Sequence, residues 1–156
     1  MEIERKYLVS ALPEGLQERQ HTDIEQCYLS TSPVMRIRQL GEDVSVFTFK
    51  RRRSNDVGAI SNVEIEFPIP ADKYKELREE RVSGLVKKTR YYIPLGSLTA
   101  ELDVFHGGHE GLKMVEVEFP TLEEADAFVP PAWFGREVSE DRRYSNEALA
   151  VMSQEI

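Results

Sequence analysis

The feature that most constrains this fold is a period-two alternation of charged and apolar residues that recurs in many segments. In residues 62–69, for example, Glu64 and Glu66 alternate with apolar neighbours. Successive side chains of a β-strand point to opposite faces, so each such segment predicts a strand with one charged face and one apolar face. Seven segments share this pattern, which favours a sheet-based fold.

Eight segments are predicted as strands, and short turns join most of them. They are residues 2–9, 26–30, 34–40, 44–52, 62–69, 85–93, 98–105 and 112–119. Helices are predicted at 71–80 after Pro70, at 121–128 with Thr121 as N-cap, and at 145–152. The most economical fold is α+β and mainly β, an eight-stranded antiparallel β-barrel with helices packed outside. We expect residues 1–156 to form a single domain.

Composition narrows the class of protein. A net charge of −8 argues against nucleic-acid binding by bulk attraction. No apolar run reaches the roughly 18 residues of a membrane span, and the N-terminus lacks the apolar region of a signal peptide. The single cysteine, Cys27, excludes an internal disulfide and a cysteine zinc cluster. We therefore expect a cytoplasmic protein that binds neither nucleic acid nor membrane; its oligomeric state stays open.

The charged strand faces carry both signs in nearly equal number. The candidate carboxylates are Glu2, Glu4, Glu64, Glu66, Glu101, Asp103, Glu116 and Glu118, and the candidate cations are Lys6, Arg36, Arg38, Lys50, Arg52, Lys88 and Arg90. Polyphosphate chemistry uses both kinds, because carboxylates hold Mg²⁺ or Mn²⁺ while Arg and Lys bind phosphate oxygens. Cross-strand ion pairs on a solvated outer face would give the same pattern. The alternation alone leaves open whether the charges face an interior or the solvent.

Beyond alternation, the chain resembles a known family, the triphosphate tunnel metalloenzymes of the CYTH superfamily, in their short bacterial branch. The resemblance begins with the ExExK motif of residues 2–6 and covers essentially the whole chain. Its further motifs are Arg36-x-Arg38, the strand ending in Lys50, Glu64-x-Glu66, the segments 88–91, 101–105 and 111–119, and the C-terminal segments 133–138 and 143–146. The resemblance implies an eight-stranded tunnel with a charged interior and a divalent metal cofactor, Mg²⁺ or Mn²⁺.

The resemblance also assigns roles to the charged residues. It implies that the triphosphate is bound by Lys6, Arg36, Arg38, Lys50, Lys88 and Arg90, and that metal is held by Glu2, Glu4, Asp103, Glu116 and Glu118. Strand alternation adds Arg52 to the residues expected to bind the substrate. Glu64 and Glu66, with Asp103, are expected to orient a second metal or the attacking water, and Lys6 is expected to assist in activating the water. Tyr28 is either a residue beside the phosphate or a core aromatic. His106 and His109 are predicted to be turn residues, since they supply only two ligands.

The predicted function is hydrolysis of a small-molecule triphosphate, with inorganic tripolyphosphate giving pyrophosphate and phosphate as the leading hypothesis. A nucleoside or thiamine triphosphatase is the nearest alternative. A class IV type of adenylate cyclase and a non-catalytic polyphosphate-binding module are further alternatives. The short chain favours the inorganic substrate, because no separate segment for a base or thiamine can be identified.

Overall fold

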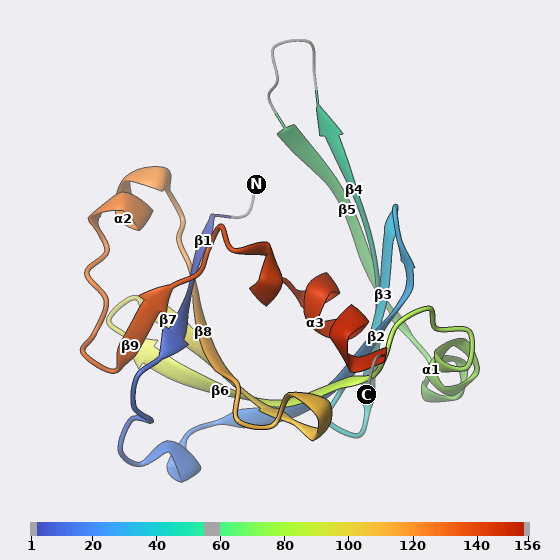
Figure 1. Cartoon of the computed structure of the whole chain (residues 1–156), viewed down its shortest axis with the longest axis horizontal. Coiled ribbons are helices and arrows are strands. Elements are labelled where there is room, and N and C mark those ends of the chain that lie inside the picture. The colour runs from blue at the N-terminus through green and yellow to red at the C-terminus, as the bar shows by residue number, and fades with distance from the viewer. Residues whose placement is uncertain (1–2, 55–59, 155–156) are drawn as a thin grey trace.

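One strongly curved antiparallel sheet makes up most of the molecule (Figure 1). The computed structural model describes residues 3–54 and 60–154, with the backbone alone for 52–54, 60–62 and 152–154. The strands are β1 (Glu4–Val9), β2 (His21–Thr31), β3 (Val34–Leu40), β4 (Val44–Ser54), β5 (Ile60–Ile69), β6 (Val86–Leu95), β7 (Leu98–His106), β8 (Lys113–Glu118) and β9 (Phe134–Glu137). The prediction of a mainly β, antiparallel fold is confirmed.

The sheet is open, so the predicted closed barrel of eight strands is wrong. Its strand order is β5-β4-β3-β2-β6-β7-β8-β1-β9, and the described strands β5 and β9 form its two edges. The short strand β9 pairs with β1 along the edge that β5 would need for closure. The sheet curls around a concave side without a hydrogen-bonded seam (Figure 1).

Sequence reasoning located eight of the strands and missed the ninth. Segment 134–137 has four residues and follows two prolines, so it carries too little alternation to identify a strand. The second strand begins at His21, five residues before its predicted start. Residues 21–25 contain one strongly apolar residue, Ile24, so they show too little alternation to extend the prediction. Within the described residues, no helix is long and apolar enough to span a membrane.

Three α-helices lie close to their predicted positions: α1 (Ala71–Arg78), α2 (Leu122–Ala127) and α3 (Asn146–Gln154). Thr121 caps α2 as predicted, since its hydroxyl accepts a hydrogen bond from the Glu124 amide at 3.1 Å. Short 3₁₀ turns occur at η1 (Leu16–Glu18), η2 (Gly107–His109) and η3 (Arg142–Tyr144). His109 lies in one of these turns, as expected, and contacts the Leu149 carbonyl oxygen at 2.7 Å.

Apolar residues pack on both sides of the sheet, in three clusters. On the convex side, Leu102 and its neighbours from β1, β7 and β8 are covered by β9 and α2, while Ile37 and Tyr74 belong to a second cluster beneath α1. On the concave side, Tyr28 and Phe105 pack against Leu149 of α3. The prediction that all helices lie outside is therefore wrong for α3, which crosses the concave side (Figure 1).

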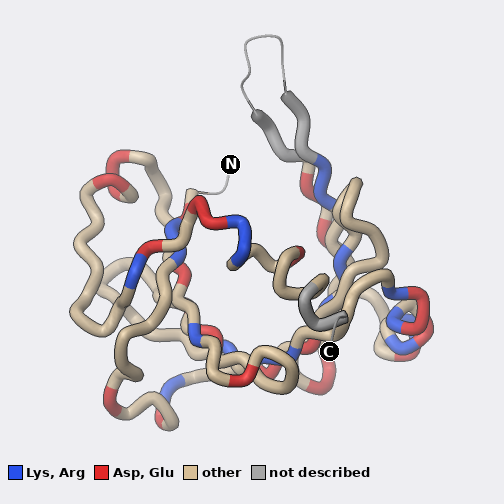
Figure 2. Tube along the Cα trace, viewed as in Figure 1, with Lys and Arg blue, Asp and Glu red and all other residues tan. Residues whose placement is uncertain are grey.

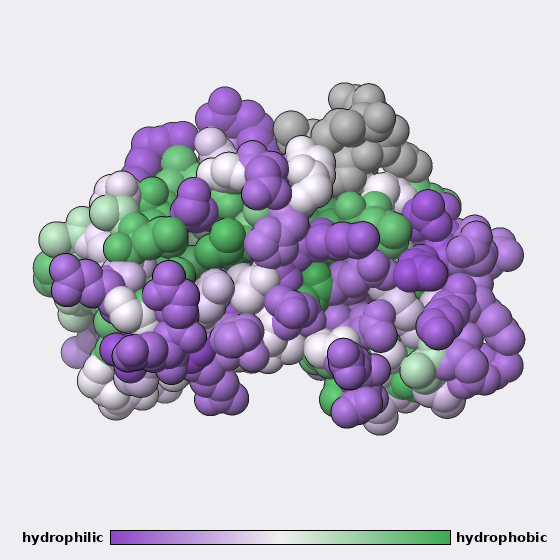
Figure 3. All heavy atoms as spheres, turned by 90° about the horizontal axis from the view of Figure 1, so that it is seen from below, coloured by the Kyte–Doolittle hydropathy of each residue, from purple (hydrophilic) through white to green (hydrophobic). Residues whose placement is uncertain are grey.

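The convex surface is mixed in hydropathy. Seen from below the view of Figure 1, hydrophilic residues cover the right part, whereas hydrophobic residues gather in the upper left (Figure 3). A sheet that turned all its charged strand faces outward would not give this mixed surface. This view favours a concave position for many of the alternating charges.

Glu25, on the convex face of β2, binds α1 through two side-chain hydrogen bonds. Its carboxylate accepts hydrogen bonds from the Tyr74 hydroxyl at 2.8 Å and the Arg78 guanidinium at 2.9 Å. Burial raises the pKa of Glu25, but these two hydrogen bonds outweigh it and hold the pKa below its ordinary value. The carboxylate form is thus stabilised by the fold.

We expect Glu25→Gln to lower the free energy of unfolding by about 1–2 kcal/mol at neutral pH. Since the pKa of Glu25 is lowered in the fold, this contribution is present above the unfolded pKa and is lost as the pH falls through the folded pKa. Urea unfolding from pH 7 to pH 3 should therefore show the difference between wild type and variant shrinking toward acid. A difference that is constant with pH would contradict the assigned role of the charge.

Candidate active site

Charged residues of both signs lie along the strands that surround the concave side (Figure 2). Pairing brings several predicted site residues into direct register across neighbouring strands: Lys6 with Glu116, Arg90 with Asp103, Glu101 with Glu116, and Lys50 with Glu64. Directly opposed side chains on one face of a sheet lie within contact distance. The period-two pattern therefore yields a charged concave surface, to which these pairs contribute from six strands.

An ion cluster on β6 and β7 forms one wall of this surface. Lys88 lies 2.9 Å from Asp103, and Arg90 donates two hydrogen bonds to the same carboxylate at 2.8 and 3.0 Å. Arg90 also contacts Glu101 at 2.8 Å. The Asp103 oxygens thus already accept from two cations, and a role in metal binding stays a prediction.

Burial shapes the ionisation of this wall. Burial lowers the pKa of the Lys88 ammonium to about 8, although the charge of Asp103 opposes the shift. Burial raises the pKa of Asp103, but Lys88 and Arg90 outweigh it, so that the net pKa is lowered. For Glu101 burial prevails over the attraction of Arg90, and its pKa is raised. A bound polyanion would stabilise the charged form of Lys88, and a bound cation would stabilise the charged form of Glu101.

Two carboxyl groups meet on β1 and β8. Glu116 shares a hydrogen bond with Glu4, and the cations Lys6 and Arg90 lie close to it. Burial raises the pKa of Glu116, but this hydrogen bond and the two cations outweigh it and lower the net pKa. Such a pair of carboxyl groups is a suitable binding place for a hard cation.

Lys6 connects this wall to the C-terminal segment. Its ammonium donates a hydrogen bond to the Tyr144 carbonyl oxygen at 3.3 Å. A small cavity beside it is lined by Glu101, Asp103, Glu116 and Asn146, the first residue of α3. Asn146 had no site role in the sequence-based prediction, because an uncharged residue at a helix start carries no charge pattern.

A second wall comes from β2, β3, β4 and β5. Arg38 contacts Glu66 at 3.4 Å, and the Thr48 hydroxyl donates to the same carboxylate at 2.9 Å. Thr48 is also a residue that the prediction left without a role. Burial, followed by the nearby charge of Arg36, lowers the pKa of Arg38 to about 10. Keeping Arg38 charged therefore costs folding free energy.

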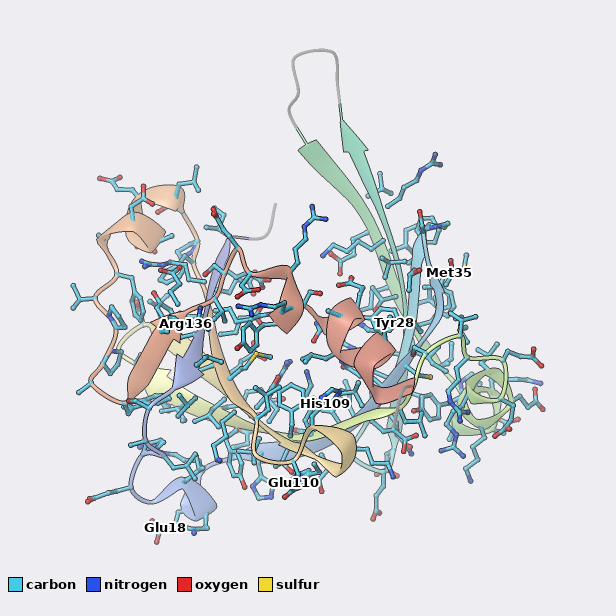
Figure 4. The ribbon with its side chains drawn as sticks, viewed as in Figure 1. Glu18, Tyr28, Met35, His109, Glu110 and Arg136 are labelled. Carbon is cyan, nitrogen blue, oxygen red and sulfur yellow. The ribbon has the colours of Figure 1, made fainter. Side chains whose placement is uncertain are left out.

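Tyr28 lies on the concave side beside α3 (Figure 4). It is fully buried, and its register partner on β3 is Arg36. Burial raises the pKa of Tyr28 to about 12, against the lowering effect of Arg36 and Arg38. Tyr28 is therefore a core aromatic that borders the cationic surface, and its place beside a bound phosphate stays a prediction.

The two walls interact through their charges. Arg36 on β3 contributes to lowering the pKa of Lys88 on β6, and Arg90 on β6 does the same to Arg38 on β3. Cations from separate strands thus repel one another across the concave side, and a bound polyanion would relieve this repulsion.

Some predicted residues lie at the exposed margin of this surface or outside the described part. Glu118 is exposed, lies opposite Glu4 in the β1–β8 register, and lines a cleft of about 440 Å³ together with Glu101 and Glu124. Glu64 is exposed on the edge strand β5. Glu2 lies outside the described residues, and so does the side chain of Arg52.

The carboxylates fit a metal that is bound together with its substrate. Among the described residues, no three Asp, Glu, His or Cys side chains converge closely enough to hold an ion by themselves. Mg²⁺ commonly takes only one or two protein carboxylates and completes its shell with water and phosphate oxygens. The Glu4–Glu116 pair meets this requirement.

Comparison with known proteins identifies relatives along the whole chain. An inorganic triphosphatase of Nitrosomonas europaea is 42% identical over 96% of this chain and 97% of its own length. An inorganic triphosphatase of Acetivibrio thermocellus is 32% identical over 95% of this chain and 92% of its own length.

Solved structures extend the likeness to the fold. A crystal structure of an inorganic triphosphatase has a TM-score of 0.74 and 39% identity, and the match covers 97% of this chain and 95% of that one. A putative adenylyl cyclase from Hippeastrum shares the fold at 18% identity and a TM-score of 0.59, over 81% of this chain and 83% of that one. Residues 1–148 match the CYTH domain. The chain therefore belongs to the CYTH domain family.

Proposed function

We propose that this protein is an inorganic triphosphatase, which hydrolyses tripolyphosphate to pyrophosphate and phosphate with a divalent metal ion. The single observation that carries the proposal is the concave surface on which Arg36 and Arg38 of one wall and Lys88 and Arg90 of the other lie together with the Glu4–Glu116 carboxyl pair. Its cations match a polyphosphate, and its carboxyl pair matches a metal. The names of the full-length relatives support the same substrate.

In this proposal the cations position the substrate. Arg36 and Arg38 on one wall and Lys88 and Arg90 on the other donate to phosphate oxygens, which binds the triphosphate across the concave side. Lys88 and Arg90 then bind substrate oxygens as well as Asp103, which stays behind them and fixes their orientation. A bound Mg²⁺ or Mn²⁺ would neutralise charge that builds on the phosphate oxygens during the reaction.

The chemical step is attack of water on a terminal phosphorus atom, which breaks the bond to the pyrophosphate leaving group. Glu66 receives hydrogen bonds from Thr48 and Arg38, and Glu64 lies two residues away on the same strand face. We assign to these carboxylates the orientation of the attacking water. Glu4 and Glu116 are assigned to the metal. Lys6 is assigned to substrate binding, for which its ammonium must give up the hydrogen bond to the Tyr144 carbonyl oxygen.

A substrate panel tests the proposal. The purified chain should release phosphate and pyrophosphate from tripolyphosphate with Mg²⁺ or Mn²⁺, and excess EDTA should abolish the release. ATP and thiamine triphosphate should be turned over at least about 10-fold less efficiently, because the described concave surface provides charge without an identified base pocket. Preference for an organic triphosphate would overturn the choice of substrate, and formation of cyclic AMP from ATP would overturn the reaction type.

A further inference from the structure

Gln26 is a buried polar residue in the middle of β2 that the ion contacts described above do not use. Its side chain is 1% exposed. Within the described part of the chain, neither its Oε1 nor its Nε2 atom has a hydrogen-bond partner. A buried amide without partners costs folding free energy, and most buried polar groups in native proteins are paired. The unpaired amide therefore indicates that a ligand binds on the concave side of the sheet.

The register places Gln26 among the cations of the concave side. It lies opposite Arg38 on β3 and opposite Val86 on β6, and it shares its strand face with Tyr28. Arg36 lies opposite Tyr28. Gln26 thus borders both the arginine pair and the floor of the concave side.

The arginines beside it show the same lack of partners at one atom each. Among the described residues, the Nε atoms of Arg36 and Arg38 are buried and make no hydrogen bond. Together with the Gln26 amide they form a donor patch of three residues, in which every unpartnered nitrogen can donate. An anion with several oxygens, such as a terminal phosphate, is the ligand class that such a patch fits.

We propose that Gln26 positions the substrate, by donating from Nε2 to an oxygen of the bound triphosphate next to Arg38. This inference rests on the proposed function and deepens it. A neutral amide adds a directed hydrogen bond without adding to the repulsion between Arg36, Arg38 and Lys88. Its contribution is one further directed hydrogen bond, beside those of the arginines, that fixes the place of one phosphate group.

The test compares two variants at this position with a matched control. Gln26→Met keeps the size of the side chain and removes its polar atoms, while Gln26→Glu places a carboxylate against the phosphate. Gln39→Met makes the same change on the other face of β3, in a cleft lined by Asp23 and His106. Each variant is assayed for tripolyphosphate hydrolysis and for its melting temperature with and without tripolyphosphate and Mg²⁺.

We expect Gln26→Met to raise KM for tripolyphosphate about 10-fold and to reduce the ligand-induced rise in melting temperature. Without ligand it should melt at or above the wild-type temperature, since an unpaired amide is removed. Gln26→Glu should raise KM further, and Gln39→Met should leave KM and the ligand-induced shift unchanged.

Two results would overturn the inference while leaving the proposed function intact. One is an active wild type whose Gln26→Met and Gln26→Glu variants keep KM within twofold. The other is a Gln26→Met variant that melts earlier but binds tripolyphosphate normally, which would make Gln26 a structural residue. A wild-type chain that neither hydrolyses nor binds tripolyphosphate would contradict the proposed function and this inference together.

Discussion

Glu116→Gln should lower kcat for tripolyphosphate by about 100- to 1,000-fold, with little change in fold. A metal ion that neutralises developing phosphate charge contributes several kcal/mol to catalysis, which corresponds to that range of rates. The glutamine keeps the shape of the side chain but removes a charged ligand from the Glu4–Glu116 pair. The Mn²⁺ concentration for half-maximal activity should rise as well.

Glu123→Gln is the matched control, because Glu123 is exposed in the first turn of α2. It should keep wild-type kcat and wild-type metal dependence. Circular dichroism and the melting temperature check that both variants fold. A Glu116→Gln enzyme with more than half of wild-type kcat at the same metal concentration would remove Glu116 from the metal site.

The second large effect is expected for Arg38→Met, which should raise KM for tripolyphosphate by about 10- to 100-fold. A hydrogen bond to a charged group contributes about 1.5–3 kcal/mol, which converts to this range. Burial and Arg36 lower the pKa of Arg38, so its charged form is costly in the free protein. The variant should therefore lose substrate affinity without losing stability.

Arg136→Met is the corresponding control, since the Arg136 side chain is 59% exposed on β9. Steady-state kinetics and thermal unfolding of both variants separate the possible roles of Arg38. A fall in melting temperature with an unchanged KM would assign Arg38 to the fold, through its contact with Glu66 at 3.4 Å, and exclude it from substrate binding.

The positions of most strands, and which face of each is charged and which is apolar, could be predicted from the sequence, because both follow from local alternation. Lys88 and Arg90 illustrate this: their spacing predicted one shared strand face, and the structure joins both side chains to Asp103 of β7 in one ion cluster. The family was also identified from such motifs, and residues 1–148 match it. The roles of the individual residues remain predictions.

Features that depend on long-range packing were not predictable from local patterns. Barrel closure depends on which strand reaches β1, and the four residues of β9 carry almost no pattern. The position of α3 depends on the packing of Leu149 against Tyr28 and Phe105 on the concave side, although the helix itself was predicted. Gln26 and Asn146 could not be identified from the alternation of charges, because their amide side chains are neutral.

The most direct test of the central claim is a crystal structure with Mn²⁺ and a non-hydrolysable imido analogue of tripolyphosphate. We expect the analogue on the concave side, in contact with Arg36, Arg38, Lys88 and Arg90, and an anomalous Mn²⁺ signal beside Glu4 and Glu116. An analogue bound on the convex face, or a metal signal remote from this carboxyl pair, would contradict the account.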